Sequence, residues 1–180
     1  MGDGALGRWG AVAQVWPTRA EQRCWNHTRR HVVDAVPLKQ QPSVLADVQT
    51  IAAAESRAEA ETARRAFHHT YRLRFPNASE GLDRDWARML TYCDFPNDHW
   101  RHLRTTNVVE SPFAAVRLRT SAAKRFKKVE NATAILWRLL RAAEQRFRKL
   151  NAPNLCRDVF HGAQYRDGIA ITPSPVKAAA

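Results

Sequence analysis

Hydrophobic residues recur at intervals of three and four in one stretch near the C-terminal end of the chain. The stripe consists of Ala132, Leu136, Leu139, Leu140, Ala143, Phe147 and Leu150. This period places its members on one face of an α-helix, so the pattern predicts an amphipathic helix that continues through the last of them. Arg138, Arg141 and Arg148 fall on the opposite face. One side of the helix would then be buried while the other carries positive charge.

The rest of the pattern also predicts helices almost throughout. They are expected over residues 4–15, 24–36, 44–54, 57–74 and 82–92, with a brief strand over 20–23. Four prolines interrupt the helical pattern, because proline removes a backbone donor and clashes with the preceding turn. These prolines are Pro37, Pro42, Pro76 and Pro96. The predicted fold class is therefore mainly α.

Composition favours a folded chain. Of the 180 residues, 44% are hydrophobic, with six Trp and seven Phe, which is enough for a core in one domain or one domain with an insertion. The Pro- and Ala-rich tail Ile171–Ala180 is expected to be disordered. Three widely spaced Cys argue against a disulfide framework and for a reducing cytosol. No signal segment opens the chain and no run approaches the roughly 18 apolar residues of a membrane span, so no membrane is expected.

Positive charge is concentrated in one segment. The formal net charge is +12, and the segments 1–40, 41–98, 99–150 and 151–180 carry +3, −2, +10 and +1. Such a balance predicts an acidic partner, with nucleic acid favoured over an anionic membrane surface or a purely solubilising role. The candidate DNA contacts are Arg101, Arg104, Arg117, Arg119, Lys124, Arg125, Lys127, Lys128, Arg138, Arg141 and Arg148. For any single one of them, a solvated surface position is an equally good interpretation.

Three local patterns contain residues suited to chemistry: Asp3 in GDGALGRW, Cys24 and His27 in QRCWNH, and Glu110 in HLRTTNVVESPFAAVRLRT. Each is weak alone. Asp-Gly pairs are common turn signals. The Cys and His spacing suits two zinc ligands, yet structural zinc takes four and no second close pair is present, so zinc is not favoured.

Glu110 has a structural alternative. Asn107 followed three residues later by Glu110 resembles a capping box at a helix N-terminus. Pro112 weakens this interpretation, because proline beyond the first turn costs about 3 kcal/mol. The helix could instead begin with Ser111 as its cap and Pro112 at its first position, which leaves Glu110 just before it.

Taken in order, the three patterns resemble the mutator-type transposases of bacterial insertion sequences, and the resemblance extends from Asp3 to about Ile171. It implies the C-terminal part of an RNase H-like α/β core of the Asp-Asp-Glu type with an all-helical insertion. Residues 1–37 would be part of that core, 38–98 the insertion, 99–170 the C-terminal core helices with the basic segment, and 171–180 the disordered tail.

The resemblance also implies a chemistry. Asp3 and Glu110 would bind two Mg²⁺ or Mn²⁺ ions, because hard cations prefer oxygen ligands and a pair of ions activates the attacking and stabilises the leaving oxygen of a phosphodiester. Water would free a 3′-hydroxyl, which then attacks target DNA. Cys24 and His27 would lie near this site. The implied partners are transposon ends and target DNA, in a homo-oligomer of the full-length form located in the bacterial cytoplasm at the nucleoid.

One departure from the family pattern qualifies this expectation. The 180 residues contain the second Asp and the Glu of the triad but no counterpart of the first Asp or of the early core strands, so this chain alone is expected to be inactive. Two alternatives remain: a non-catalytic basic DNA-binding remnant of a transposase, and a small zinc-binding helical module built on Cys24, His27 and His31.

Overall fold

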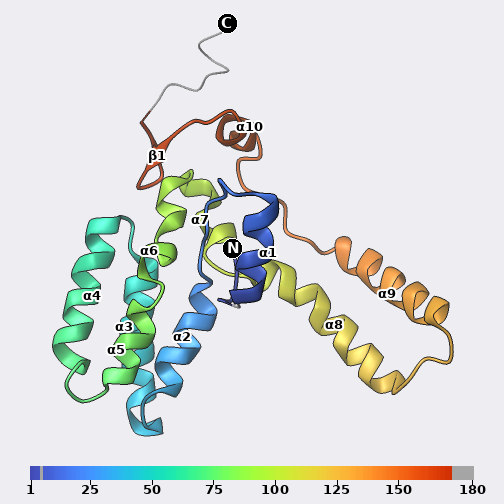
Figure 1. Ribbon diagram of the computed structural model, residues 1–180, viewed down its shortest axis with the longest axis horizontal. Helices are drawn as coiled ribbons and strands as arrows, with labels where there is room; N and C mark the ends of the chain where they lie inside the picture. The colour runs from blue at the N-terminus through green and yellow to red at the C-terminus, as the bar shows by residue number, and fades with distance from the viewer. Residues whose placement is uncertain (5, 172–180) are drawn as a thin grey trace, which may run out of the picture. The chain divides into compact units, whose positions relative to one another are not determined.

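The computed structural model describes residues 1–4 and 6–171, which separate into two units (Figure 1). Unit 1 comprises residues 1–105 together with the chain from Asn151 onward, and unit 2 comprises Thr106–Leu150. Helices dominate both, so the prediction of a mainly helical chain is confirmed. Of the tail predicted to be disordered, residues 172–180 lie outside the described residues.

Unit 1 contains most of the secondary structure. Its α-helices are α1 (Leu6–Val15), α2 (Trp25–Asp34), α3 (Gln41–Ala53), α4 (Arg57–Tyr71), α5 (Pro76–Asp83), α6 (Trp86–Met89), α7 (Trp100–Leu103) and α10 (Leu155–Phe160). Its 3₁₀ turns are η1 (Leu38–Gln40), η2 (Thr91–Asp94) and η3 (Asn97–His99). Two short strands, β1 (Tyr165–Arg166) and β2 (Ile169–Ala170), pair with each other. Unit 2 contains α8 (Asn107–Ala123) and α9 (Val129–Glu144).

The core of unit 1 lies among α2, α3, α4 and α5, which pack against one another. Val32, Val48, Ile51 and Leu82 are completely buried, and Phe67 is 2% exposed. Burying side chains of this size contributes roughly 1.5–3 kcal/mol each, so this cluster provides the main stabilisation of unit 1. Trp25 is 3% exposed and belongs to the same cluster.

Local signals explain where two of these helices begin. Ser56 caps α4 by accepting a hydrogen bond from the backbone N–H of Glu59 at 3.1 Å. Pro42, predicted to break the chain, instead lies in the first turn of α3, where its missing N–H would have no partner in any case. Pro76 starts α5 in the same way. The predictions for the helices of residues 44–54 and 57–74 are confirmed apart from their ends.

The single helix predicted over residues 82–92 is wrong. The structure has the end of α5, the short helix α6 and the turn η2 instead. The side-chain amide of Gln22 and the indole N–H of Trp25 both donate to the carbonyl of Met89 at 3.0 Å. The backbone N–H of Tyr92 donates to Oε1 of Gln22 at 2.7 Å. These buried side chains bind backbone groups that a continuous helix would pair internally, so long-range contacts override the local propensity.

The brief strand predicted over residues 20–23 is reduced to one parallel bridge between Gly2 and Arg23. A strand pair missed by the sequence analysis occurs later, where β1 and β2 form an antiparallel hairpin. Its turn residues, Asp167 and Gly168, have φ of 47° and 81°. An Asp-Gly pair with two positive φ values is typical of a tight hairpin turn, so this dipeptide was the signal.

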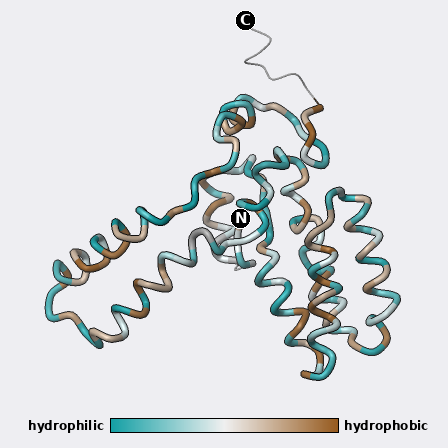
Figure 2. Tube along the Cα trace, turned by 180° about the vertical axis from the view of Figure 1, so that it is seen from behind, coloured by the Kyte–Doolittle hydropathy of each residue, from teal (hydrophilic) through white to brown (hydrophobic). Residues whose placement is uncertain are grey.

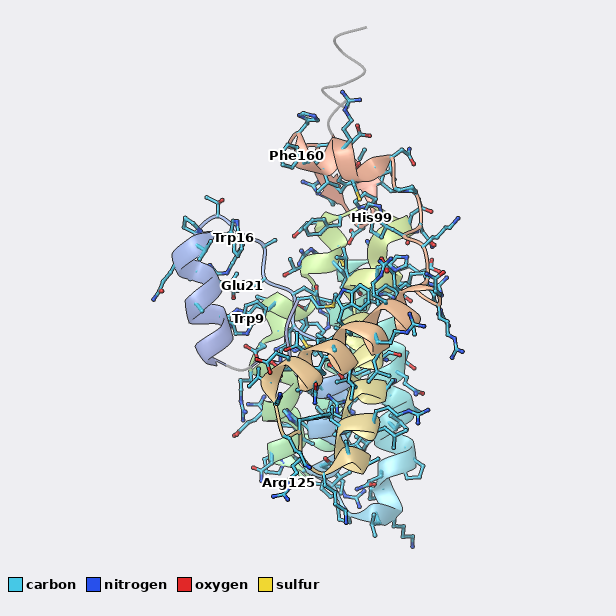
Figure 3. The ribbon with its side chains drawn as sticks, turned by 90° about the vertical axis from the view of Figure 1, so that its right-hand side faces the viewer. Trp9, Trp16, Glu21, His99, Arg125 and Phe160 are labelled. Carbon is cyan, nitrogen blue, oxygen red and sulfur yellow. The ribbon has the colours of Figure 1, made fainter. Side chains whose placement is uncertain are left out.

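Unit 2 is a pair of contacting helices joined by a loop, with Arg125 in that loop (Figures 1 and 3). Figure 2 shows hydrophobic and hydrophilic positions alternating along α9. The prediction of an amphipathic helix is confirmed except for its end. The helix stops at Glu144 and not at Leu150, so Phe147 and Leu150 lie beyond it. None of the α9 side chains is buried, so the apolar stripe does not form a core. In the part of the chain that the structure describes, no helix is both long and apolar enough to span a membrane.

Candidate functional site: two acidic positions and a basic surface

Asp3 is positioned by the bridge between the N-terminal segment and the residues before α2. The backbone N–H of Gly2 donates to the carbonyl of Gln22 at 2.9 Å, and the N–H of Cys24 donates to the carbonyl of Gly2 at 2.8 Å. Asp3 follows directly and is half-buried. The structure therefore brings the Asp3 segment next to the Cys24 segment, two motifs that are 20 residues apart in the sequence.

The residues on both sides of Asp3 are glycines for steric reasons. A Cβ on Gly2 would lie 2.8 Å from Cζ2 of Trp9. A Cβ on Gly4 would overlap the guanidinium of Arg23, and Gly4 has φ of 96°, a conformation that other residues adopt with strain. Asp3 is thus held between two close contacts with the backbone. The Asp-Gly signal identified a position whose geometry depends on glycine.

Ion pairs fix the segment that receives this bridge. Arg23 is 7% exposed, and its Nε lies 3.2 Å from the carboxylate of Asp85. Nε of Arg88 lies 2.8 Å from Glu21, a residue labelled in Figure 3 together with Trp9 of α1 and the nearby Trp16. Because the Arg23–Asp85 pair is largely buried, it holds this segment against residues 85–88 more firmly than an exposed pair would.

Cys24 and His27 stand at the start of α2. Cys24 is its N-terminal cap and is completely buried, while His27 lies in the first turn and is half-buried. In the described residues, no group of three or more His, Cys, Asp and Glu side chains is arranged to hold a metal ion. The hydrogen bond between the backbones of Gly2 and Cys24 brings the segment of this pair next to the Asp3 segment, and the role of the pair near a catalytic site stays a prediction.

Glu110 lies in the first turn of α8, not before the helix. The alternative in which the helix begins at Pro112 is wrong, because α8 starts at Asn107 and contains Pro112. The capping residue is Thr106 rather than Asn107. The hydroxyl of Thr106 donates to the carboxylate of Glu110, and the backbone N–H of Glu110 donates to the carbonyl of Thr106 at 3.1 Å. These two bonds hold the side chain of Glu110 at the N-terminal end of α8.

A cavity of about 610 Å³ opens beside Glu110 within unit 2. Its wall is formed by Asn107, Glu110, Ser111, Pro112, Ala114, Arg117, Arg146, Phe147 and Arg148. Glu110 is the one acidic side chain in this lining, which also contains three arginines. Arg146 was not among the predicted DNA contacts. Those contacts were chosen from the helix face that carries Arg138 and Arg148, and Arg146 is not on that face. The available signal was the run QRFRK at residues 145–149, in which basic residues alternate with an aromatic one.

The other predicted DNA contacts are distributed over both units. On unit 2, Arg117 and Arg119 lie on α8, Lys124, Arg125, Lys127 and Lys128 at the loop, Arg138 and Arg141 on α9, and Arg148 beyond it. All of these are exposed. Arg141 pairs with Glu144, and Arg138 lines a separate apolar hollow with Trp137. Unit 2 therefore presents most of the basic surface, and contact of these residues with DNA stays a prediction.

Arg101 and Arg104 belong to unit 1, and their surroundings differ. Arg101 is exposed at α7. Arg104 is half-buried, with its guanidinium 4.4 Å from the ring centroid of Tyr92 and 5.0 Å from that of Trp100. Its Nη2 also donates to the carbonyl of Ala54 at 3.0 Å. These contacts indicate that Arg104 stabilises unit 1, since cation–π contacts strengthen where the cation is partly desolvated.

Two buried groups near this arginine resist ionisation. Burial raises the pKa of Tyr92 to about 12, although the adjacent Arg104 opposes the shift. Burial also raises the pKa of the Cys93 thiol, which Arg57 partly counteracts. Because a thiolate is the reactive form of cysteine, Cys93 is a packing residue rather than a nucleophile.

Asp3 and Glu110 both supply oxygen donors, the type that Mg²⁺ and Mn²⁺ prefer. Asp3 belongs to unit 1 and Glu110 to unit 2, so their joint role in one site stays a prediction. The described residues of either unit do not gather three potential ligands. Each carboxylate therefore fits a divalent cation by chemistry, while the full ligand set is not assembled within a unit.

Comparison with known proteins gives a family match over most of the chain. Residues 1–149 match the family model described as "Transposase, Mutator family". The chain is 37% identical over 169 residues to the transposase for insertion sequence element IST2 of Acidithiobacillus ferrooxidans. That alignment covers 94% of this chain and 57% of the relative.

Two further relatives extend the comparison. The chain is 40% identical over 168 residues to the transposase for insertion sequence element IS6120 of Mycolicibacterium smegmatis, covering 93% of this chain and 52% of the relative. It is 28% identical over 109 residues to the transposase for insertion sequence element IS905 of Lactococcus lactis, covering 61% of the chain and 28% of the relative. The chain thus spans about half the length of the two more similar relatives.

Proposed function

Since the chain belongs to the mutator family of transposases, we propose that it forms part of an enzyme that cuts and joins DNA strands during transposition. The observation that carries this proposal is the arrangement around Glu110. A carboxylate fixed at the start of α8 shares a cavity with three arginines, which suits a phosphodiester beside a cation-binding group. Transposases cleave and transfer DNA, so DNA is the proposed partner.

In this proposal Asp3 and Glu110 are ligands of an Asp-Asp-Glu site within an RNase H-like core. Divalent ions bound there, Mg²⁺ or Mn²⁺, supply activation of the attacking oxygen and stabilisation of the leaving oxygen. The backbone bridge between Gly2 and Arg23 positions the Asp3 segment, and the hydroxyl of Thr106 orients the Glu110 carboxylate. The exposed basic residues of unit 2 hold the DNA backbone and contribute little sequence information.

The proposed site is distributed between two segments of this chain and requires a third carboxylate for complete two-metal chemistry. We therefore expect the 180-residue chain to bind DNA but to show no turnover in a strand-cleavage assay with Mg²⁺ or Mn²⁺. Robust cleavage by the purified chain would contradict this expectation. In the full-length form, assembly into a homo-oligomer would bring two transposon ends together.

The test of the carboxylate roles uses a readout other than activity. Fe²⁺ replaces Mg²⁺ at oxygen-ligand sites and, with ascorbate and peroxide, generates radicals that cut the nearby backbone. We expect cuts near Asp3 and Glu110, with those near residue 110 lost in Glu110→Gln. Glu130→Gln is the matched control, because Glu130 is also an acidic residue in the first turn of a unit 2 helix, α9.

A non-catalytic DNA-binding role is the second candidate, favoured by the eleven Lys and Arg residues against three Glu in Thr106–Leu150. Under that alternative, DNA binding falls steeply with salt, does not respond to Mg²⁺, and is the same in Glu110→Gln. Absence of localised Fe²⁺ cleavage in the original chain would then support the alternative and reject the metal-ligand roles of Asp3 and Glu110.

A further inference from the structure

Phe147 occupies an unexpected position for a member of an apolar helical stripe. The helix α9 ends at Glu144, and the backbone N–H of Phe147 donates to the carbonyl of Glu144 at 3.1 Å in the turn that follows. Its side chain is 55% exposed and lines the cavity beside Glu110. An aromatic ring left accessible in a cavity is available to a ligand rather than to the core.

The charges around this ring define the chemistry of the ligand. Arg146 and Arg148 flank Phe147 in the sequence, and both line the cavity together with Arg117 of α8. Three guanidinium groups favour phosphate, which they can bind through paired N–H donors. An aromatic face beside them favours a planar base, because base stacking on aromatic side chains is a general mode of single-strand recognition.

The size and position of the cavity further restrict the class of ligand that it can bind. Its volume of about 610 Å³ lies in the range of small-ligand sites, which is sufficient for a nucleotide but not for a duplex. A base inside a duplex has both faces stacked on its neighbours, so only an unpaired base can stack on Phe147. Glu110 lies in the same lining, at the position where the proposed function requires the reacting phosphate.

We propose that this cavity binds an unpaired nucleotide of the DNA substrate, with its base on Phe147 and its phosphate on Arg146 and the neighbouring arginines. The inference rests on the proposed function for the role of Glu110 and adds a substrate feature to it. The enzyme would prefer DNA whose strand is open beside the reacting phosphate over a fully paired duplex of the same length.

The test measures binding of the purified 180-residue chain to three labelled DNAs by fluorescence anisotropy. One is a blunt duplex, one carries a short single-stranded overhang, and one carries the same overhang with abasic sites. We expect tighter binding to the overhang than to the blunt duplex, and loss of this gain with the abasic overhang. Phe147→Ala should lower affinity for the overhang about ten-fold, while Phe147→Trp should preserve it.

Two further variants separate stacking from charge. Trp137→Ala is the matched control, because Trp137 is 61% exposed in unit 2 and precedes an arginine, but lines an apolar hollow away from Glu110. It should keep the overhang preference. Arg146→Gln should weaken binding to both the blunt and the overhang DNA. The slope of the logarithm of the binding constant against the logarithm of the salt concentration should become shallower by about one.

The inference is overturned if the original chain binds the three DNAs equally, if Phe147→Ala retains the preference, or if Trp137→Ala loses it. Any of these results with Fe²⁺ cleavage still localised near Asp3 and Glu110 rejects the nucleotide site while leaving the proposed function standing. Absence of DNA binding by the original chain rejects both.

Discussion

Units 1 and 2 have similar apolar-residue patterns in their helices but use them differently. In unit 1, apolar residues of α2 to α5 meet in one cluster, where Val48 and Ile51 are completely buried. In unit 2, the stripe on α9 contributes no buried residue, and Pro112 and Val116 of α8 are the buried helical positions among the side chains described there. The difference shows that an amphipathic pattern specifies a face, whereas the neighbouring elements decide whether that face becomes core.

Charge follows the same division. In unit 1, arginines form ion pairs with carboxylates of neighbouring segments. Arg23 pairs with Asp85, and Nη2 of Arg64 lies 2.7 Å from Oδ1 of Asp83. Unit 2 contains eleven basic residues but only three carboxylates, and one of these, Glu144, pairs with Arg141. The excess of positive charge in unit 2 is therefore available for an external anion. Unit 1 supplies a stable frame, and unit 2 supplies the candidate DNA surface.

The largest expected effect comes from opening the core of unit 1. Phe67→Ala should lower the free energy of unfolding by about 3–5 kcal/mol. The substitution removes a ring that is 2% exposed and whose centroid lies 4.8 Å from the ring centroid of Tyr71. Urea denaturation followed by circular dichroism measures the change. Trp137→Ala on α9 serves as the comparison and should change stability by less than about 0.5 kcal/mol. Equal losses in the two variants would show that α9 is buried and that the contrast between the units is wrong.

A smaller effect is expected at the support of Asp3. Gly4→Ala should destabilise unit 1 by about 1–3 kcal/mol, because the residue has φ of 96° and its new Cβ would displace the Arg23 guanidinium. Hydrogen exchange of the Gly2 and Cys24 backbone amides reports the bridge directly, and both amides should exchange faster in Gly4→Ala than in the original chain. Gly10→Ala is the control, since its Cβ position on α1 meets no atom of the described residues within 4 Å apart from its chain neighbours and its own helix backbone, and the variant should be more stable by about 0.5–1 kcal/mol. Unchanged protection in Gly4→Ala would remove the proposed steric support.

The smallest effect is a pH dependence that arises at Tyr92 in unit 1, because Thr106–Leu150 contains no tyrosine. The folded-state pKa of Tyr92 is raised to about 12 from an ordinary value near 10. The folded state therefore holds this proton more tightly, so the stabilisation is present below pH 10 and is lost as the pH rises toward 12. Denaturation curves at pH 9, 10 and 11 should show this decline.

Tyr92→Phe isolates the contribution of the hydroxyl from that of other groups that titrate in alkali. The variant should keep its fold, since the buried ring and its edge contact with Trp100 stay in place. Its stability should fall less between pH 9 and 11 than that of the original chain. Parallel curves for the two proteins would assign the alkaline decline to groups other than Tyr92.

The sequence predicted several elements because their signals are local. A high content of helix-forming Ala, Glu and Arg located α3 and α4, and Ser56 with Glu59 marks the start of α4. The helix predicted over residues 82–92 failed because Gln22, more than 60 residues earlier, binds backbone groups there. Hydrophobic periodicity contains no information about a side chain that arrives from such a distance.

The candidate site shows the same limit. Asp3, Cys24 and Glu110 were identified from ordered motifs, and the structure adds the bridge that joins the first two segments. Arg146 and the accessible ring of Phe147 were missed, because the apolar period continued past the true end of α9. Where a helix ends depends on how the following residues pack, and this changes which side chains are accessible.

The sequence by itself determined the family, the helical character of the chain and the concentration of positive charge in residues 99–150, because these depend on residue type and order. Only the tertiary structure decided that no side chain of α9 becomes buried, that Glu110 lies inside α8, and that Phe147 shares a cavity with Glu110 and three arginines. Burial and proximity arise from contacts between segments distant in the chain, and local patterns do not encode them.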